Sequence, residues 1–399
     1  MKDKQSILKE ILRAVSYVLV AALASVFTYF SVAPGKPVFL GQTDQSTKLD
    51  EIKWYIDNYY IGEYTEEALY DGAAAGMIAG TGDRWSYYLT AEQYGSYMEQ
   101  MKNAYVGIGV TISSPEDIEG FLVEKVEPSG GAYEAGIQVG DIIIQVEDQD
   151  AKQLGTDGAA ILIKGAEGST VSVVVMRGEE KLTFSVTRKL VQVQVASYQM
   201  LENNVGLITI YNFDDRCAEE TKAAIETLRE QGAQALLFDV RFNPGGYRHE
   251  LEYLLDYLLP EGTIFHAVGY DGKEDKTQSD KNCLEMPMAV LVNEDSYSAA
   301  ELFAAALQEY GWAKVVGTPT TGKGYFQTTY QLSDGSAINL SIGKYVTPVK
   351  GINLAETGGL QPDLIKEVDE ETYYNISAGK LSAEEDPQIQ AAVALLLQK

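Results

Sequence analysis

The sequence predicts a mixed, multidomain α/β (α+β) chain: an N-terminal transmembrane helix, a helical segment, a small β-rich domain and an α/β core. Three observations support this prediction. An uncharged run follows a basic N-terminus, short β-type runs replace helical spacing near residue 104, and strand-length apolar runs alternate with helical patterns from about residue 204. A chain of 399 residues, 45% of them hydrophobic, is long enough for more than one core.

The N-terminus predicts a membrane anchor. Residues 1–13 are net basic, and residues 14–33 carry no charge. Twenty helical residues span about 30 Å, the thickness of the bilayer's hydrocarbon core. Because the basic flank comes first, we expect a single-pass cell-membrane protein with residues 1–13 in the cytoplasm and the rest outside it. A cleaved signal peptide is the alternative, although Pro34 directly after the small residues is unfavourable for cleavage.

Composition shifts divide the remainder of the chain. Residues 34–47 combine Pro, Gly and small polar residues, as a stalk would. Residues 48–103 have apolar spacings of three and four and predict helices, in which we expect the many aromatic side chains to pack. Residues 104–190 contain short β-type runs with two helical stretches. Residues 191–380 predict a mostly parallel sheet covered by helices, and residues 381–399 a C-terminal helix.

Composition also limits the function. There are 31 Lys and Arg against 58 Asp and Glu, a net charge of −27, so the chain lacks the basic face that nucleic-acid binding requires. With only His249 and His266, a Ser–His–Asp triad would depend on one of two residues, and a His-rich metal site is not expected. Cys217 and Cys283 allow at most one disulfide, and the sequence does not say whether they pair. We expect no metal and no cofactor.

Two loops at predicted strand ends have unusual residues, and strand ends are where ligand-binding loops of α/β sheets lie. In residues 241–246 (RFNPGG), two glycines allow backbone N–H groups to face a ligand, although a plain β–α turn is also possible. In residues 293–301 (NEDSYSAAE), Ser296 and Ser298 precede a helix. Either serine alone is more commonly a helix cap, but a serine there can also be a nucleophile assisted by the helix dipole.

A third loop, residues 317–324 (GTPTTGKG), approaches the phosphate-binding pattern but lacks its final hydroxyl residue. β-type residues follow it, with Asp334-Gly335 at a predicted hairpin turn, whereas a phosphate-binding loop opens a helix. A nucleotide site is therefore not expected, and Lys323 taken alone could be a plain surface lysine. A second Ser–Lys spacing, from Ser341 to Lys344, falls on a predicted strand, where residues three apart face opposite sides.

Together, the three loops resemble the carboxyl-terminal processing, or tail-specific, serine peptidases. The pattern is Asn-Pro-Gly-Gly, then Ser-x-Ser-Ala-x-Glu, then Thr-x-Gly-Lys-Gly-x-x-Gln. The resemblance implies a crotonase/Clp-like α/β protease core. It also implies Ser298 as nucleophile, Lys323 as general base and Gln327 as the residue that orients the amine.

This chemistry needs no histidine. A lysine amine is normally protonated at neutral pH, but burial among apolar residues such as Val315, Val316 and Phe326 would favour the neutral form that can deprotonate Ser298. The oxyanion would be held by two backbone N–H groups. One belongs to the residue directly after the nucleophile, and the other to one of the two glycines of the first loop. The candidate residues are Ala299, Gly245 and Gly246.

Residues 104–190 resemble a PDZ domain in its bacterial, circularly permuted order. The resemblance rests on YVGIGV (105–110) and AGIQVGDII (135–143). In such domains an extended peptide adds to a sheet edge, and its terminal carboxylate sits on backbone N–H groups of a Gly-rich loop. An unrelated β-rich domain is the alternative. The resemblance implies that exposed apolar C-termini bind at five residues: Val106, Gly107, Ile108, Gly109 and Val110.

The leading hypothesis is a membrane-anchored, extracytoplasmic serine endopeptidase that recognises protein C-termini and cleaves with a Ser–Lys(–Gln) mechanism. Its partners would be protein or peptide substrates and the membrane, and the resemblance allows a homodimer. A catalytically silent binding protein is the second hypothesis, which the intact Ser298 and Lys323 disfavour. A third is cation binding by the acidic residues 271–285 and 367–372, for which a solvated surface is the simpler explanation.

Overall fold

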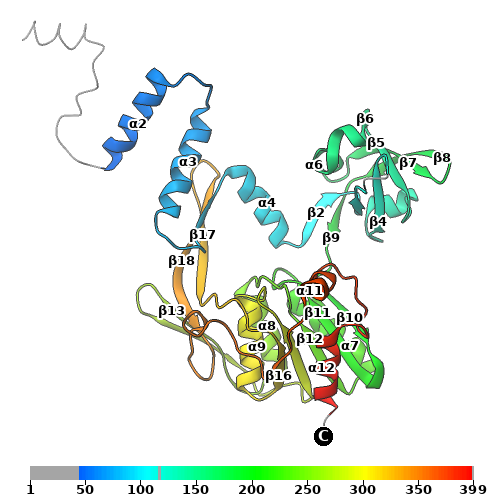
Figure 1. Cartoon of the computed structure of the whole chain (residues 1–399), viewed down its shortest axis with the longest axis vertical. Coiled ribbons are helices and arrows are strands. Elements are labelled where there is room, and N and C mark those ends of the chain that lie inside the picture. Colours follow the sequence, from blue (N-terminus) through cyan, green and yellow to red (C-terminus); the bar gives the residue numbers. More distant parts are fainter. Residues whose placement is uncertain (1–44, 116–117, 398–399) are drawn as a thin grey trace, which may run out of the picture. The chain divides into compact units, whose positions relative to one another are not determined.

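The structure is a computed structural model that describes residues 45–115 and 118–397 (Figure 1). The predicted cytoplasmic segment, the anchor and most of the stalk lie outside these residues. Within the described part of the chain, no helix is long and apolar enough to span a membrane. The chain divides into two units, residues 1–70 and 71–399, each taken by itself below.

The described part of the first unit consists of α2 (Gln45–Tyr59) and the beginning of α3 (Glu66–Ala79). Lys53 joins these helices, because its ammonium lies 2.9 Å from Asp57 and 3.1 Å from Glu66. The aromatic side chains of α2 pack against one another. The Trp54 ring lies edge-on to Tyr55, with centroids 5.1 Å apart, and Tyr55 is itself exposed.

The second unit begins within α3 and continues through β1 (Tyr87–Leu89) and α4 (Ala91–Met101). Helix α4 starts with a capping box, in which Thr90 Oγ1 accepts the Gln93 N–H and the Gln93 side chain accepts the Thr90 N–H. Strand β1 lies inside the region predicted to be helical. It forms because its three residues pair with a distant strand, a contact that local spacing cannot indicate.

A separate β-domain follows, which we define as residues 104–192. Its main sheet has the order β3-β4-β5-β7-β8, with β6 beside β5, so β3 is an edge strand. Two helices, α5 and α6, pack on a core that includes Ile108, Phe121 and Val173. Gly136 ends α5 in the left-handed conformation, as the turn predicted from the sequence requires. The strands and helices are β2 (Ala104–Gly107), β3 (Val110–Ser113), β4 (Phe121–Val126), α5 (Gly131–Ala135), β5 (Ile142–Val146), β6 (Gln149–Asp150), α6 (Ala151–Ile163), β7 (Thr170–Arg177), β8 (Glu180–Thr187) and β9 (Lys189–Gln192).

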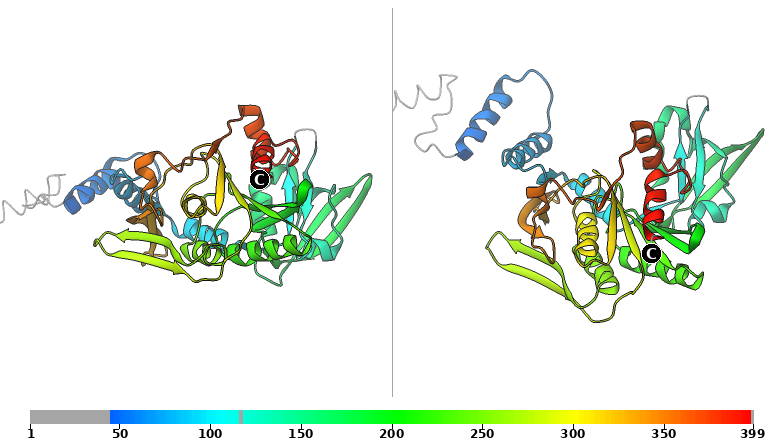
Figure 2. Two further views of the ribbon diagram at one scale, coloured as in Figure 1. Left: turned by 90° about the horizontal axis from the view of Figure 1, so that it is seen from below. Right: turned by 60° about the horizontal axis from the view of Figure 1, so that its bottom comes forward.

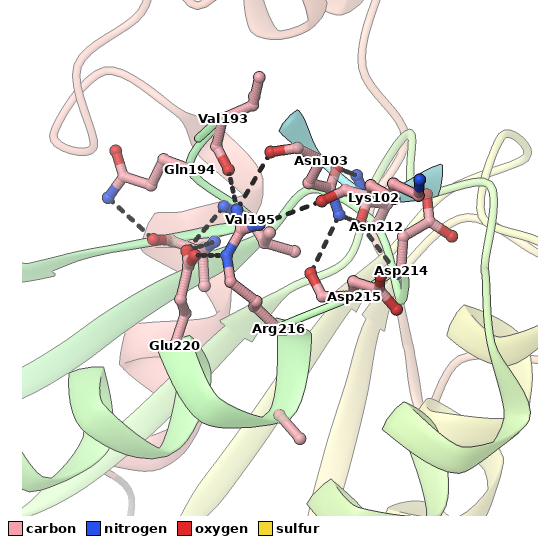
Figure 3. Close-up of polar contacts among 12 residues, drawn as sticks. Lys102, Asn103, Val193, Gln194, Val195, Asn212, Asp214, Asp215, Arg216 and Glu220 are labelled. Atoms are coloured by element: carbon pink, nitrogen blue, oxygen red, sulfur yellow. Dashed lines mark hydrogen bonds and ion pairs between the residues drawn. The ribbon is translucent and has the colours of Figure 1, made fainter. Parts of the chain in front are cut away.

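The first and last strands of the β-domain lie side by side, and so do the linkers attached to them at Asn103 and Val193. β2 pairs antiparallel with β9, and the Val193 N–H donates to the Asn103 carbonyl at 2.7 Å. Arg216 donates to the carbonyls of Lys102, Asn103 and Val193 (Figure 3). Glu220, which forms an ion pair with Arg216, accepts the N–H groups of Val195 and Ala196, just after Val193. One Arg–Glu pair at the start of a core helix therefore holds both linkers.

The core sheet has the order β10-β11-β12-β15-β16-β19 and is parallel except for β10, as the alternating pattern predicted. The inner strands β12 and β15 are buried at every position because helices cover both faces of the sheet. The elements are β10 (Ala196–Met200), η1 (Glu202–Asn204), β11 (Val205–Ile210), α7 (Cys217–Glu230), β12 (Ala235–Asp239), α8 (Arg248–Leu258), β15 (Met288–Val292), α9 (Ala299–Glu309), β16 (Ala313–Gly317), β19 (Leu364–Ile365), α11 (Glu370–Ser377) and α12 (Pro387–Leu396).

Alternate residues of the core strands face different helices. Phe238 packs in the cluster with α7, α8 and α9, whereas its neighbour Leu237 packs in the cluster with α12. Figure 2 shows α12 (red) and α7 (green) on opposite faces of the core sheet. Arg241, just after β12, fixes α12 by ion pairs to Asp239 at 2.6 Å and Asp386 at 2.8 Å. Both faces of the sheet are thus closed, and the loops at the strand ends are left to form a site.

A second sheet has the order β1-β18-β13-β14, with β17 also paired to β18. The predicted Asp334-Gly335 turn is present, since the Leu332 N–H donates to the Ser336 carbonyl across it. The acidic residues 271–285 include strand β14, and their charges pair with basic neighbours, for example Glu274 with Lys276 at 2.6 Å. The remaining elements are β13 (Gly262–Gly269), β14 (Glu274–Ser279), β17 (Tyr325–Gln331), β18 (Ala337–Val346) and α10 (Leu354–Thr357).

Candidate active site

A cleft of about 920 Å³ lies between the core sheet's loops, the second sheet and α4. It contains every residue predicted to act in catalysis or to hold the oxyanion: Ser298, Lys323, Gln327, Ala299, Gly245 and Gly246. The other Ser–Lys spacing, Ser341 and Lys344, lines a neighbouring cavity of about 840 Å³ that does not include Ser298 or Lys323.

The two serines at the start of α9 have different surroundings. Ser296 is fully buried, and its Oγ donates to the Val240 carbonyl at 2.7 Å and accepts the Asn293 N–H at 3.0 Å. It is a structural residue. Ser298 lines the cleft, and its backbone has φ 61° and ψ −119°, an unusual conformation for a residue with a Cβ. Such strain is common where a sharp turn presents a functional side chain.

Lys323 lies between left-handed glycines, Gly322 and Gly324. Its Nζ is 4.9 Å from the ring centroid of Trp85 and 5.9 Å from that of Tyr297. Burial lowers its pKa to about 8, although the carboxylates of Glu301 and Asp83 act in the opposite direction. Burial next to apolar groups was expected, but aromatic rings provide it. Val315 and Val316 lie instead in the two cores of the main sheet.

The structure brings Gln327 into the cleft but not to the lysine. The Gln327 Nε2 donates to Ser341 Oγ at 3.0 Å and to the Tyr325 carbonyl at 3.3 Å. Within the described residues, no hydrogen bond joins Lys323 Nζ to Gln327 or to Ser298 Oγ.

The oxyanion candidates differ in what their N–H groups contact. The Gly245 N–H donates to Asn243 Oδ1 at 2.8 Å, and fully buried Asn243 also donates to the Ile210 carbonyl. In the part of the chain that the structure describes, the N–H groups of Gly246 and Ala299 have no partner. Of the two glycines, only Gly246 has an N–H group that no hydrogen bond engages among the described residues. Gly245 instead packs against the Ser298 turn.

Three further cleft residues were not predicted. Trp85 covers the Lys323 amine. The buried Tyr345 hydroxyl accepts the Gly324 N–H at 3.1 Å, and burial raises its pKa well above the ordinary value. Burial, Asp215 and Glu250 together raise the pKa of Asp214 to about 7. Trp85 lies in residues 83–89 (DRWSYYL), but a single aromatic residue more commonly indicates packing than a place in an active site, so this run carries no specific signal. Nothing local distinguishes Tyr345 or Asp214.

The residues predicted to bind peptide C-termini lie in the β-domain. Val106 and Gly107 end β2, Ile108 is fully buried, and Val110 begins the edge strand β3. Gly109 has φ +78°, and an added Cβ would lie 2.8 Å from the Gly130 Cα. The turn thus requires glycine, and β3 has a free edge within the described sheet where an extended segment could pair.

One group of potential metal ligands occurs among the described residues: Asp215, His249 and Glu250, whose ligand atoms lie within 4.8 Å of one another. Glu250 is already engaged, because its Oε2 accepts the Ala218 N–H at 2.7 Å in the first turn of α7. Glu250 thus has a structural role at the start of α7. Cys217 and Cys283 are both free thiols in the structure.

Comparison with known proteins identifies both domains. The model of peptidase family S41 matches residues 204–365, and the PDZ domain model matches residues 105–187. The carboxy-terminal processing protease CtpA of Bacillus subtilis (strain 168) is 32% identical over 338 residues, covering 82% of this chain and 72% of that protein. A CtpA-like serine protease of Staphylococcus aureus (strain COL) is 31% identical, covering 83% of this chain and 67% of that protein.

A solved structure has the same fold. An S41 protease from Bacteroides fragilis NCTC 9343 is 16% identical, with a TM-score of 0.51 over 90% of this chain and 98% of that one. The β-domain and the α/β core therefore define a serine-type peptidase that carries a PDZ domain. The chain belongs to peptidase family S41, among the carboxyl-terminal processing proteases.

Proposed function

We propose that the protein is a membrane-anchored, extracytoplasmic endopeptidase that binds substrate C-termini in its PDZ domain and cleaves with Ser298 and Lys323. One observation carries the proposal: a single cleft contains Ser298, a half-buried Lys323 and two backbone N–H groups without partners in the described part of the chain. The crotonase/Clp-like description of the core, drawn from the family resemblance, belongs to the same proposal.

The proposed reaction uses residues of this chain alone. The neutral Lys323 amine takes the proton from Ser298, whose Oγ attacks the scissile carbonyl. The N–H groups of Gly246 and Ala299 stabilise the oxyanion of the tetrahedral intermediate. The Lys323 ammonium then protonates the leaving amine, which gives an acyl-enzyme. Water, deprotonated by Lys323, hydrolyses this ester and restores the serine.

Substrate selection is proposed to rest on the β-domain. Residues 106–110 would receive the terminal carboxylate, and the peptide would extend along the free edge of β3. The five residues are mostly apolar, which suits apolar side chains at the end of the peptide, and the loop is Gly-rich, which suits the terminal carboxylate. Fluorescence anisotropy with peptides that differ only in a free or amidated C-terminus tests this step, since amidation should abolish binding.

Substitution of both proposed catalytic residues tests the mechanism. Purified fragment 35–399 should cleave an unfolded protein with an apolar C-terminus, and Ser298→Ala or Lys323→Ala should abolish cleavage, read by mass spectrometry. His249 lines the same cleft and supplies the informative comparison. If lysine is the base, His249→Ala should still cleave the substrate. Loss of cleavage in His249→Ala together with retained cleavage in Lys323→Ala would overturn the Ser–Lys assignment.

The anchor is proposed from residues 14–33 and their basic flank. Full-length protein should remain in the membrane fraction after alkaline extraction, with its catalytic part accessible to added protease from the outer side. Release of a shortened chain, with a new N-terminus near residue 34, would establish the signal-peptide alternative instead.

A further inference from the structure

Glu301, the third residue of α9, is fully buried and accepts hydrogen bonds from two separate segments of the core. One donor is the Ser298 N–H, at 3.0 Å from Oε2. The others are the Lys323 N–H, at 3.0 Å from the same oxygen, and the Gly322 N–H, at 2.7 Å from Oε1. The Thr320 hydroxyl also donates to Oε1.

A helix cap alone does not account for this arrangement. A capping-box glutamate needs only the backbone N–H at the start of its own helix, which Ser298 provides. The three other donors come from a loop 19 to 22 residues further along the chain. The Glu301 Oε2 thus receives the backbone N–H groups of both the proposed nucleophile and the proposed base.

Both of these residues lie in backbone that needs external support. Ser298 has the strained dihedral angles described above, and Lys323 stands between two left-handed glycines outside any helix or strand. Thr321 and Thr318 provide further direct links between the segments. Thr321 donates its N–H to the Ser296 carbonyl and its hydroxyl to the Glu294 carbonyl, and the Thr318 hydroxyl donates to the Glu294 carboxylate. Those bonds involve neighbours of the reacting residues, whereas Glu301 accepts hydrogen bonds from the N–H groups of Ser298 and Lys323 themselves.

We propose that Glu301 is a positioning residue for the peptidase reaction, because its carboxylate fixes the backbones of nucleophile and base to one another. The proposal rests on the Ser–Lys function proposed above. Glu301 contacts neither substrate nor the Lys323 amine by a hydrogen bond within the described residues, so it acts through Ser298 and Lys323. Four charge-assisted bonds in a buried site make the arrangement rigid.

The charge of Glu301 gives the proposal a distinctive signature. Two carboxylates, Glu301 on α9 and Asp83 before β1, raise the pKa of Lys323 against the larger effect of burial. The other groups around the amine are the rings of Trp85 and Tyr297, which carry no charge at neutral pH. Removing the Glu301 charge should therefore lower the pKa of Lys323 further, an effect that a loss of folded protein alone would not produce.

Glu301→Gln tests the proposal. Glutamine keeps the shape, but only one of its two terminal atoms can accept, so at least two of the four bonds are lost. We expect kcat to fall about 100-fold with KM within about threefold, because displaced reacting groups cost rate more than ground-state binding. The acidic limb of the kcat/KM profile should move below its wild-type position near pH 8. Thermal melting and circular dichroism measure the folded fraction.

Thr320→Val is the matched control, since it removes one donor to the same carboxylate, together with the acceptor of the Leu360 N–H, and leaves the Glu301 charge. We expect a severalfold loss in kcat at unchanged KM, with the acidic limb in its wild-type position. If Glu301→Gln does not fold, this kcat loss in folded Thr320→Val decides the question, and wild-type kcat would overturn the proposal.

Two results with Glu301→Gln would also overturn the proposal. One is wild-type kcat with an unmoved acidic limb. The other is a loss of activity that only follows the unfolded fraction, again with an unmoved limb, which would make Glu301 a helix cap and nothing more. Failure of the Ser–Lys function is seen separately, as full activity in Ser298→Ala or Lys323→Ala.

Discussion

Lys323 links the local environment of one side chain to the pH dependence of the whole reaction. The neutral amine is the form that accepts a proton, and burial lowers its pKa to about 8. We therefore predict that kcat/KM rises with pH through about 8 and levels off above about 9, measured with a quenched fluorescent peptide. A limb near 10.5, the ordinary value for lysine, would contradict the burial argument, and one near 6.5 would indicate histidine.

Asp214 makes a prediction about stability. Its pKa is raised from 3.8 to about 7 in the fold, so between these pH values the folded state binds a proton that the unfolded state has lost. The free energy of unfolding should fall as pH rises through this window. Asp214→Asn should raise it by about 1–3 kcal/mol at pH 8 and change it little at pH 4, measured by urea denaturation. Equal effects at both pH values would contradict the assignment.

The turn after β12 joins two elements at the site. Gly245 has φ +90°, and a Cβ there would lie 2.7 Å from the Ser298 Cβ. We predict that Gly245→Ala lowers kcat at least about tenfold, because it displaces the nucleophile and the neighbouring oxyanion donor. Gly232→Ala is the control: φ is +96° but nothing lies within 4 Å, so only a stability loss of about 1 kcal/mol is expected. Wild-type kcat in Gly245→Ala would exclude this role.

The elements also show what the sequence could and could not predict. Core strands were predictable because burial on both faces makes them continuous apolar runs, and the Asp334-Gly335 hairpin because its turn type selects those residues. Strand β14 (EDKTQS) could not be predicted from the sequence, because it is polar on both faces and forms by pairing with β13.

The same limit applies to the site. Ser298 and Lys323 were indicated by the resemblance of three loop motifs to the tail-specific peptidases, since each residue taken alone also fitted a helix cap or a surface lysine. The distinction between Gly245 and Gly246 was not predictable, because it depends on the orientation of the Asn243 amide. The Gln327 contact with Ser341 is likewise set by the pairing of β17 with β18.

For the molecule as a whole, the Arg216–Glu220 pair couples the β-domain linkers to the core. Arg216→Ala removes three hydrogen bonds to linker carbonyls and frees Glu220. We predict that hydrogen exchange at residues 193–196 becomes about tenfold faster, measured by mass spectrometry.

Arg229→Ala is the control for this prediction, because Arg229 lies on the same helix and, in the described part of the chain, forms an ion pair only with the half-exposed Glu226. Exchange in the two linkers should be unchanged in that variant. Equal acceleration in both variants would show that the pair does not hold the linkers.

The antiparallel pairing of β2 with β9 has a consequence for how such a chain can evolve. The polypeptide leaves the core at Asn103 and returns at Val193, and these two residues are hydrogen-bonded neighbours. The intervening segment is therefore a cassette whose two ends coincide in space. A short turn could rejoin the core after its loss, and a different recognition module with adjacent termini could replace it, so specificity can be exchanged without rebuilding the hydrolytic centre.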